Sequence, residues 1–476
     1  MNALLAVFSL LLVAFIVLAV PTIVAPHSVA YDMTFTSFDT AKAVLLCGVL
    51  ATFAGWVFYR QRDNGLFLVR IFVAALLTRV LLGTIIFMFN GRDFFGGDAI
   101  HYDFYGTAQL LAWQGDRYFQ GIMNTYIGRE TVEGGGLVGA WGMLYMVAGI
   151  YSLVGRNTLA VQMVVAVLGA ATAPVIYLCA SHVFKNARVA RLSAFAVAFY
   201  PSLVLWSSQG LKDGPIVFFL AVAILTTMKL GEKFSLKYLG ILVGALFCVL
   251  TFRFYVFYMI STAVAGAFVI GMQKVTARSF ARQFAVIILV GLGLTYLGVT
   301  RYASVHLNFY TRLERVQQSR QDSALSGQSG YGREVDVSTS GGAIASIPLG
   351  LTYLLFAPFP WQLTSLRQSI TLPEMVIWWA SFPLLILGLW FSIKYRLRQI
   401  SPVLIFTVML SLAYSIVQGN VGNAYRQRSQ LLVFYFIFVA VGCVLLLEKR
   451  EEQKRRDLKE PEPLPVRLAA SELSRR

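Results

Sequence analysis

Long apolar runs constrain the fold of this chain more than any other feature of its sequence. A helix that crosses a bilayer needs about 20 mainly apolar residues. Of the 476 residues, 57% are hydrophobic and 13% are charged, whereas soluble domains carry roughly 25% charged residues. The runs long enough to span lie near 4–25, 43–59, 66–89, 158–183, 190–208, 214–230, 237–252, 254–272, 284–300, 374–393, 401–418 and 430–447.

The first of these runs, 4–25, is not preceded by basic residues. A cleavable signal peptide normally has such a basic region. We therefore expect this run to remain in the membrane as a signal anchor. The four cysteines lie inside apolar runs, where buried thiols serve as packing residues.

Basic clusters between the runs predict the topology. They lie at 60–62, 185–191, 229–237, 274–282, 394–398 and 448–456. Because Lys and Arg mark cytoplasmic loops, all six clusters are expected inside, together with both termini. This arrangement also explains the net charge of +17 without a nucleic-acid partner. It requires two further apolar stretches, 137–155 and 344–361, to be re-entrant or interfacial helices on the outer side.

The predicted fold class is therefore an all-α polytopic membrane protein. It has about twelve transmembrane helices plus two re-entrant or interfacial helices. The predicted parts are two N-terminal helices (1–65), a membrane core (66–230) with an outer loop (90–136), further spanning helices (231–300), an outer loop and interfacial helix (301–373), C-terminal spanning helices (374–447) and a disordered basic cytoplasmic tail (448–476). The arginines of the polar loop 301–343 are expected to be solvated.

Ionisable residues gather in the loops that this topology places outside. Charged groups at the membrane are costly and usually functional. The outer loop after the third run contains Asp93, Asp98, His101 and Asp103. Later outer turns add Lys212, Asp213, Arg426 and Arg428, and Arg253 lies at a helix junction where it can pair with an outer acid or phosphate.

This set of residues suits the transfer of a group from a phosphate-linked lipid to a hydroxyl. A carboxylate can accept the proton of the attacking hydroxyl, and guanidinium groups bind a phosphate through paired hydrogen bonds. The sequence has no P-loop, no dinucleotide fingerprint and no Cys/His cluster with zinc spacing. We therefore predict no cofactor and no metal ligands, although a divalent metal stays open.

The outer loop and the segments after it resemble the GT-C superfamily of membrane glycosyltransferases. Asp98, Tyr102, Ala108 and Gly115 are similar to the first outer loop of the protein O-mannosyltransferase and lipid A aminoarabinose transferase types. The resemblance covers roughly 66–230 and, more weakly, the turn before the last helix. It implies a GT-C-like fold and places catalytic acids at Asp98 and Asp213. The family often has two adjacent acids in the first loop, whereas Ala99 follows Asp98 here. Asp103 is therefore an alternative candidate for the catalytic base.

Each candidate also has a structural interpretation. Asp98 and Asp213 can simply cap the helices that follow them, and Arg426 and Arg428 can be interfacial anchors. The committed candidates are three catalytic acids (Asp98, Asp103 and Asp213) and six substrate-binding residues (His101, Tyr102, Lys212, Arg253, Arg426 and Arg428).

The predicted function is transfer of a sugar, with inversion, from a polyprenyl-phosphate-linked donor to an extracytoplasmic glycan, lipid or protein. The expected location is a bacterial inner or plasma membrane, with membrane lipids as further partners. Two alternatives stay open. One is a surface-polysaccharide polymerase or ligase, and the other is a transporter of lipid-linked glycan, which should show charged groups near the bilayer midplane and internal repeats.

Overall fold

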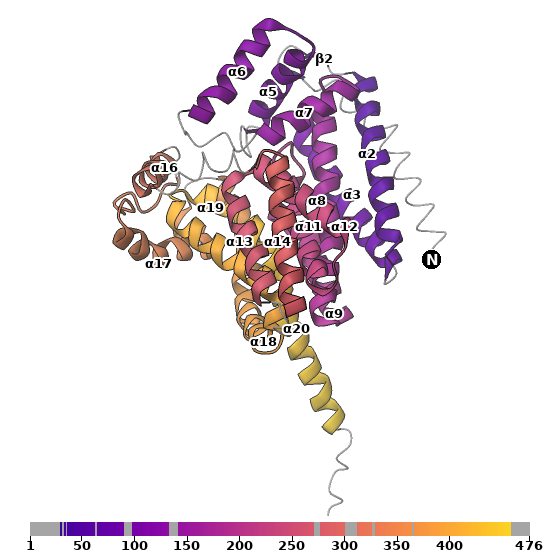
Figure 1. Cartoon of the computed structure of the whole chain (residues 1–476), viewed down its shortest axis with the longest axis vertical. Coiled ribbons are helices and arrows are strands. Elements are labelled where there is room, and N and C mark those ends of the chain that lie inside the picture. Colours follow the sequence, from indigo (N-terminus) through magenta and orange to yellow (C-terminus); the bar gives the residue numbers. More distant parts are fainter. Residues whose placement is uncertain are drawn as a thin grey trace, which may run out of the picture.

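The computed structural model is almost entirely helical (Figure 1). It describes residues 29–30, 33–34, 36–61, 64–89, 98–132, 141–270, 277–299, 312–325, 329–363 and 366–457. Two short strands, β1 (Val29–Ala30) and β2 (Met33–Thr34), form an antiparallel pair before the first described helix.

Most helices before residue 300 correspond to predicted apolar stretches, whereas two lie in the predicted outer loop 90–136. The helices of this part are α2 (Ser37–Tyr59), α3 (Gly65–Met88), α5 (Asp98–Trp113), α6 (Arg117–Val132), α7 (Trp141–Val154), α8 (Thr158–Phe184), α9 (Ala187–Phe199), α10 (Pro201–Ser207), α11 (Asp213–Glu232), α12 (Leu236–Phe252), α13 (Phe254–Ile270) and α14 (Ala277–Tyr296). The two in the outer loop are α5 and α6.

The C-terminal part adds five α-helices and one 3-10 turn. These are α16 (Leu313–Leu325), α17 (Ser340–Phe356), η2 (Pro360–Gln362), α18 (Leu366–Val417), α19 (Val421–Gln427) and α20 (Ser429–Asp457).

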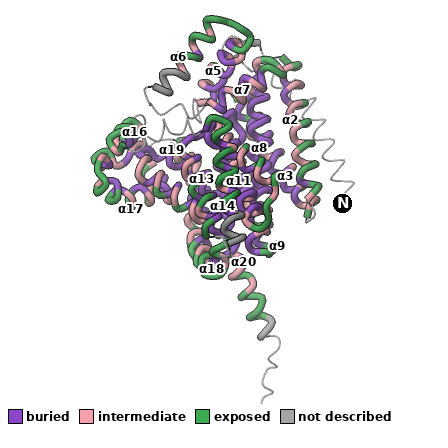
Figure 2. Tube along the Cα trace, in the orientation of Figure 1, coloured by how far each residue is buried: buried purple, intermediate pink, exposed green. Residues whose placement is uncertain are grey.

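Helix α8 forms the centre of the molecule. It packs against α2, α3, α9 and α11, and 89% of its most apolar window is buried (Figure 2). Its sequence is apolar on all sides, which is typical of a helix enclosed by others. The surrounding helices expose apolar side chains such as Leu45 and Phe53 on α2, as expected for surfaces that face lipid.

Helix α18 is two helices joined at a break. Arg396 has non-helical backbone angles. Trp378 and Ser411 would lie about 50 Å apart in one straight helix. Both instead contact Tyr435: the Trp378 ring stacks 6.2 Å away and the Ser411 Oγ lies 2.7 Å from the Tyr435 hydroxyl. The chain therefore folds back at Arg396, between the predicted runs 374–393 and 401–418.

A second break separates α9 from α10, whose axes differ by 54°. The guanidinium of Arg79, which is 1% exposed, donates to the carbonyls of Val197 and Ala198 at the end of α9 and to the Ser207 hydroxyl. These bonds satisfy backbone oxygens that a broken helix leaves free. Arg79 thus has a structural role in the middle of the helix bundle.

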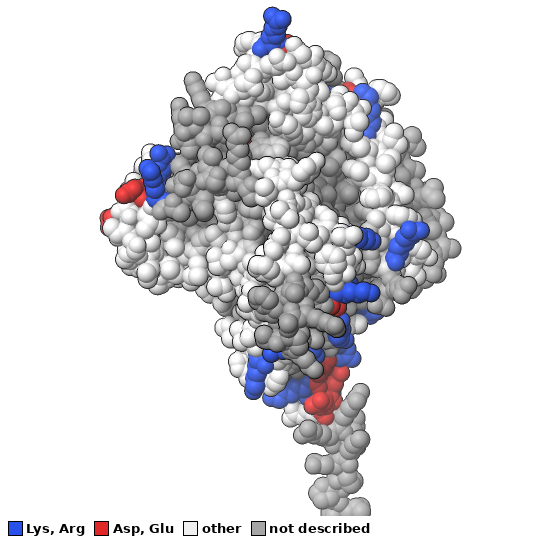
Figure 3. Space-filling view, viewed as in Figure 1, with Lys and Arg blue, Asp and Glu red and all other residues white. Residues whose placement is uncertain are grey.

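Basic residues gather at one end of the helix bundle. Asn186 and Arg188 bond Glu448 and Glu451 of α20, and the break in α18 lies at the same end. Figure 3 shows Lys and Arg gathered where α20 leaves the bundle. We call this the basic end. Helices α5, α6 and α7 lie at the opposite end (Figure 1).

The predicted all-helical membrane class is confirmed, whereas the number of spans is not settled. Among the described residues, six helices are long and apolar enough to cross a membrane, or seven if the bent α9–α10 pair is one span. Shorter apolar helices include α7 and α17, which match the two stretches predicted not to cross. The first run, 4–25, lies outside the described residues.

Two predictions about polar segments are corrected. Helix α20 continues to Asp457, so residues 448–457 of the predicted disordered tail are helical. The loop 301–343 contains helix α16, and its Arg320 is 1% exposed rather than solvated. Arg320 donates to the Ile416 carbonyl at 2.8 Å, because the end of α18 leaves carbonyls that need donors.

Candidate functional site

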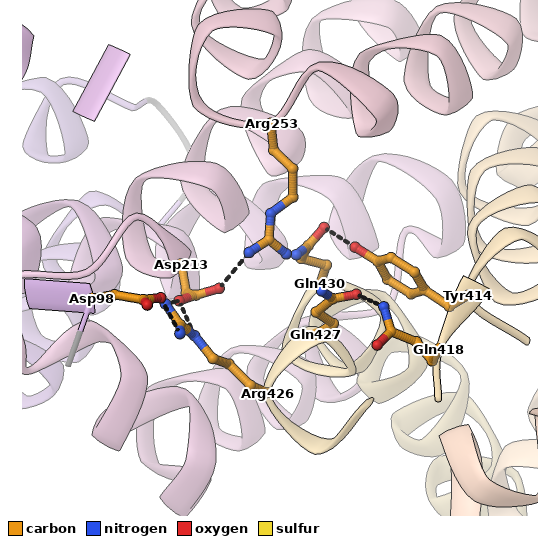
Figure 4. Close-up of polar contacts among 8 residues, drawn as sticks. All are labelled: Asp98, Asp213, Arg253, Tyr414, Gln418, Arg426, Gln427 and Gln430. Atoms are coloured by element: carbon orange, nitrogen blue, oxygen red, sulfur yellow. Dashed lines mark hydrogen bonds and ion pairs between the residues drawn. The ribbon is translucent and has the colours of Figure 1, made fainter. Parts of the chain in front are cut away.

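Three helical segments distant in sequence bring two acids and an arginine together (Figure 4). Asp98 begins α5, Asp213 begins α11, and Arg426 lies in the last turn of α19. The Arg426 guanidinium contacts Asp98 Oδ2 at 2.6 Å and Asp213 Oδ2 at 2.6 Å. One arginine therefore bridges two carboxylates. Its guanidinium carbon, Cζ, lies over the Trp206 ring, 5.6 Å from the ring centroid.

The two carboxylates differ in their access to solvent. The Asp98 side chain is 49% exposed, whereas that of Asp213 is 1% exposed. Asp213 is enclosed because Arg253 contacts its second oxygen, Oδ1, at 3.4 Å. Of the two predicted partners of Arg253, an acid or a phosphate, the structure shows the acid, Asp213. Asp98 is thus the carboxylate that an incoming molecule can reach.

Arg253 lies at the junction of α12 and α13, where the backbone is extended. The side chain is 6% exposed. Its buried Nε and Nη1 groups find no acceptor of good hydrogen-bond geometry among the described residues, although Tyr414 and Gln430 lie nearby (Figure 4). Buried guanidinium donors normally have partners, so this cation retains capacity for an anion.

Lys212 adds a third cation to the cluster. It forms no ion pair within the described part of the chain, and its ammonium lies 6.0 Å from the centroid of the Tyr102 ring. Desolvation of the ammonium group, together with the positive charges of Arg253 and Arg426, lowers the pKa of Lys212 to about 7. Its charge therefore changes within the physiological pH range.

The electrostatic field of the cluster keeps Asp98 ionised. Burial disfavours the carboxylate, but the charge and hydrogen bond of Arg426 outweigh it and lower the pKa of Asp98 below its ordinary value. Tyr102, which is 4% exposed, has a raised pKa because of burial and the negative charge of Asp98. Burial lowers the pKa of His101, whose Nε2 lies 2.9 Å from the Tyr126 hydroxyl.

Local backbone features hold these side chains in place. The Asn420 side chain caps α19 by accepting from the amides of Gly422 and Asn423, as N-cap residues do. The turn before α11 rests against α3, because Gly83 has no side chain. A Cβ at Gly83 would lie 2.6 Å from the Ser208 carbonyl oxygen.

Asp103 does not join the cluster. It is 8% exposed and accepts from the Tyr151 hydroxyl at 2.7 Å and from Arg156 at 2.7 and 3.1 Å. These contacts tie α5 to α7 and to the turn before α8. Sequence reasoning did not single out Arg156 as the partner, because no local pattern links residues on different helices.

Arg428 lies apart from Arg426. It is 2% exposed, bonds the Ala357 carbonyl, and lies 3.1 Å from the Met375 sulfur. Glu374 accepts a hydrogen bond from the Tyr425 hydroxyl at 2.9 Å. Its carboxylate is close enough to Arg428 to attract the guanidinium charge. The two arginines that the sequence analysis grouped therefore contact different residues.

Several polar residues of the site were not predicted. The Tyr414 hydroxyl donates to Gln430 at 3.0 Å, and Gln418 donates to Gln427 (Figure 4). Tyr414 lies inside an apolar run, where nothing in the sequence distinguishes it from a packing residue. Asp93 lies outside the described residues. In the described segments, no three His, Cys, Asp or Glu side chains are grouped to hold a metal.

Part of the chain matches a known family. The model of the dolichyl-phosphate-mannose-protein mannosyltransferase family matches residues 139–297, less than half of the chain. This region runs from α7 to α14 and includes Lys212, Asp213 and Arg253. The match confirms the resemblance to the protein O-mannosyltransferase type of the GT-C superfamily. No curated protein matches the chain significantly.

Two solved structures share distant similarity with the chain. ArnT from Cupriavidus metallidurans, bound to undecaprenyl phosphate, is 14% identical with a TM-score of 0.42. The match covers 66% of this chain and 52% of that one. The oligosaccharyltransferase AglB from Archaeoglobus fulgidus, in complex with an inhibitory peptide and a dolichol-phosphate, is 14% identical with a TM-score of 0.39, covering 67% and 43%. This chain thus spans about half of their length.

Proposed function

We propose that the protein is an integral membrane glycosyltransferase that moves a sugar from a polyprenyl-phosphate carrier to a hydroxyl of an extracytoplasmic glycan, lipid or protein. The observation that carries the proposal is the arrangement of Asp98, half-exposed, beside a cluster of three cations. The family match to mannosyltransferases over residues 139–297 supports it.

In this proposal Asp98 acts as the general base. It is ionised at neutral pH because of Arg426, and it is the accessible acid of the cluster. The acceptor oxygen attacks the anomeric carbon while its proton passes to Asp98. The bond from that carbon to the phosphate oxygen breaks, and its electron pair leaves with the phosphate. A single displacement of this kind inverts the anomeric centre.

Lys212, Arg253 and Arg426 would hold the donor phosphate. Among the described residues, the acids of the cluster are Asp98 and Asp213. When Lys212 is protonated, one positive charge is left for a phosphodiester to balance. Guanidinium groups suit this task through paired hydrogen bonds. As the phosphate gains charge on leaving, it competes with Asp98 for Arg426, and Asp98 becomes a stronger base.

The position of the cluster favours this chemistry over transport. Asp98 and Asp213 begin their helices, and Arg253 lies between α12 and α13. Transporter sites lie near the bilayer midplane. The one deeply buried charge of α3, Arg79, bonds backbone carbonyls and Ser207. It therefore serves the helix break rather than a translocation pathway.

The direct test is release of polyprenyl phosphate from synthetic polyprenyl-phosphate sugars by the purified protein in detergent. Transport cannot be observed there, because detergent micelles do not separate two compartments. In parallel, mass spectrometry compares surface glycans and lipid-linked sugars in cells with and without the protein. We expect product formation in detergent, and cells lacking the protein should lose a surface sugar and accumulate its carrier form.

Asp322→Asn provides the matched control for the Asp98→Asn variant. Asp322 is an exposed acid on α16 and is not among the charged groups that act on Asp98 and Arg426, so its loss removes the same charge without changing the contacts of the cluster. Activity retained by Asp322→Asn and lost by Asp98→Asn supports the proposal. An absence of product with every donor, together with altered distribution of lipid-linked glycan across vesicles, would instead establish transport.

A further inference from the structure

A surface cavity of about 720 Å³ opens beside α5 and α6, the helices that lie opposite the basic end (Figure 1). One face of α6 forms most of its wall, since the lining residues of this helix recur with three- and four-residue spacing. They are Tyr118, Gly121, Ile122 and Thr125. The cavity is separate from the ion pairs of Asp98, Asp213 and Arg426, because none of these three residues lines it.

Aromatic rings connect the cavity to the Asp98 cluster. Tyr105 and Tyr126, which also line the cavity, stack with their ring centroids 4.1 Å apart. The His101 ring lies 4.5 Å from the Tyr105 ring, and its Nε2 lies 2.9 Å from the Tyr126 hydroxyl. The charges of Asp98 and Lys212 act on His101, so this ring borders both the cavity residues and the charged cluster.

The spacing along α5 sets the distance between the two regions. Asp98, His101 and Tyr105 share one face of the helix, at positions i, i+3 and i+7. A rise of about 1.5 Å per residue places Tyr105 about 10 Å along the helix axis from Asp98. This separation is about the length of two linked sugar rings.

The cavity faces water rather than lipid. Exposed positions of α6 carry polar side chains such as Gln120, Asn124 and Thr125, whereas Met123 is 2% exposed and packs into the core. A lipid-facing helix such as α2 instead exposes apolar side chains. The ligand of this cavity is therefore a water-soluble group and not a lipid tail.

The wall has the chemistry that recognises a sugar. A pyranose ring has an apolar face of C–H groups and a rim of hydroxyls. Tyrosine rings offer apolar faces with a polar hydroxyl at one end, and three tyrosines line the cavity. Arg117 and Thr125 add hydrogen-bonding groups. The described lining contains no carboxylate, so a cationic ligand is not favoured.

We propose that this cavity binds a sugar unit of the acceptor, which makes the acceptor a glycan chain rather than a bare protein or lipid. The proposal rests on the sugar transfer proposed above. The terminal sugar presents its attacking hydroxyl to Asp98, and the next unit lies against Tyr105 and Tyr118. The cavity thus selects the acceptor, while the charged cluster holds the donor.

The test measures oligosaccharide binding in the absence of any donor. Purified protein in nanodiscs is applied to an array of bacterial and synthetic oligosaccharides, and the saccharide that binds is then titrated. Tyr118→Ala should bind it roughly tenfold more weakly, because an aromatic contact is lost. Gly121→Leu should abolish binding. A Cβ at Gly121 meets no atom within 4 Å, so the added side chain enters the cavity.

Matched controls lie on α2, which does not line the cavity. Tyr59→Ala removes another exposed tyrosine, and Gly55→Leu adds the same side chain at a second helical glycine with open surroundings. Both should bind the saccharide like the wild type. Leucine is a better helix former than glycine, so Gly121→Leu does not weaken α6. Thermal unfolding verifies that all four variants are folded.

Two outcomes would overturn the inference. One is saccharide binding by the two cavity variants that equals binding by the two controls. The other is absence of binding to every oligosaccharide on the array. Release of polyprenyl phosphate with a peptide or lipid acceptor, with Gly121→Leu as active as the wild type, would then leave the proposed transfer in place and exclude only the glycan acceptor. Cavity-dependent saccharide binding without cleavage of any donor would support the saccharide site and contradict the transfer.

Discussion

A guanidinium nitrogen of Arg426 donates to Asp98 Oδ2 at 2.6 Å, although 328 residues separate the two in sequence. The same guanidinium donates through Nε to Asp213 at 2.6 Å. Arg426 therefore joins the start of α5 to the start of α11. Any change at Arg426 acts on both carboxylates at once, and this coupling determines the first two predictions.

Asp98→Asn should lower kcat by roughly 100-fold or more, because loss of a general base removes a contribution of that size. The variant keeps the shape of the side chain and stays folded. Asp103→Asn should behave differently, since its carboxylate is bonded to Arg156 and Tyr151. It should lower the stability by about 1–3 kcal/mol. Kinetics and thermal unfolding of the two variants distinguish the roles, and a stable, inactive Asp103→Asn with active Asp98→Asn would reverse them.

Arg426→Lys should lower kcat/KM for the donor clearly, because a lysine is a point charge that cannot contact Asp98 and Asp213 with separate nitrogens. Arg428→Lys should leave the donor KM unchanged and lower the thermal stability, since Arg428 is buried beside Ala357 and Met375. Kinetics with a synthetic donor in nanodiscs measure both effects. If Arg426→Lys transfers sugar normally, a single positive charge at this position suffices and the paired contacts to Asp98 and Asp213 are not needed for transfer.

The donor KM should increase as the pH rises through about 7. Below that pH Lys212 is charged, and above it the amine is neutral, because its pKa is about 7. Loss of one charged contact to phosphate weakens binding roughly tenfold. The donor phosphodiester does not titrate in this range. Lys212→Arg stays charged and should give a donor KM that is independent of pH.

Changes in stability do not explain such a pH profile. The pKa of Lys212 is lower in the folded protein than in the unfolded chain, so the unfolded chain binds more protons between about pH 7 and its ordinary pKa of 10.5. The contribution of Lys212 to stability therefore increases with pH there, opposite to the expected loss of donor binding. A donor KM that stays constant in the wild type would exclude Lys212 from the phosphate site.

The predicted orientation can be tested with single cysteines in a chain whose four natural cysteines are replaced by alanine. Cysteines at the exposed positions Ser319 and Ser340 should react with an impermeant thiol reagent in intact cells, whereas one at Ser235, at the basic end, should react only after lysis. The reason is that basic clusters stay in the cytoplasm. Labelling of the Ser235 site in intact cells would invert the topology.

The helices themselves were predictable from the sequence. Each described spanning helix coincides with an apolar run, and the break at Arg396 lies within a predicted basic turn. These features depend on residues that are neighbours in the chain: about 20 apolar residues suffice to form a spanning helix. The sequence also predicted that Arg253, at a helix junction, pairs with an outer acid or a phosphate, and in the structure it contacts Asp213.

Which charged residues share a site was decided by the tertiary structure. Successive helix residues differ by about 100° in direction, so Arg426 and Arg428 point to opposite sides although they are two apart. Asp98 and Asp103 likewise lie on different faces of α5, where only Asp103 meets Arg156. Hydropathy specifies that a helix forms but not its rotation or its neighbours. These are set by packing between distant segments, such as Gly83 of α3 against the turn at Ser208.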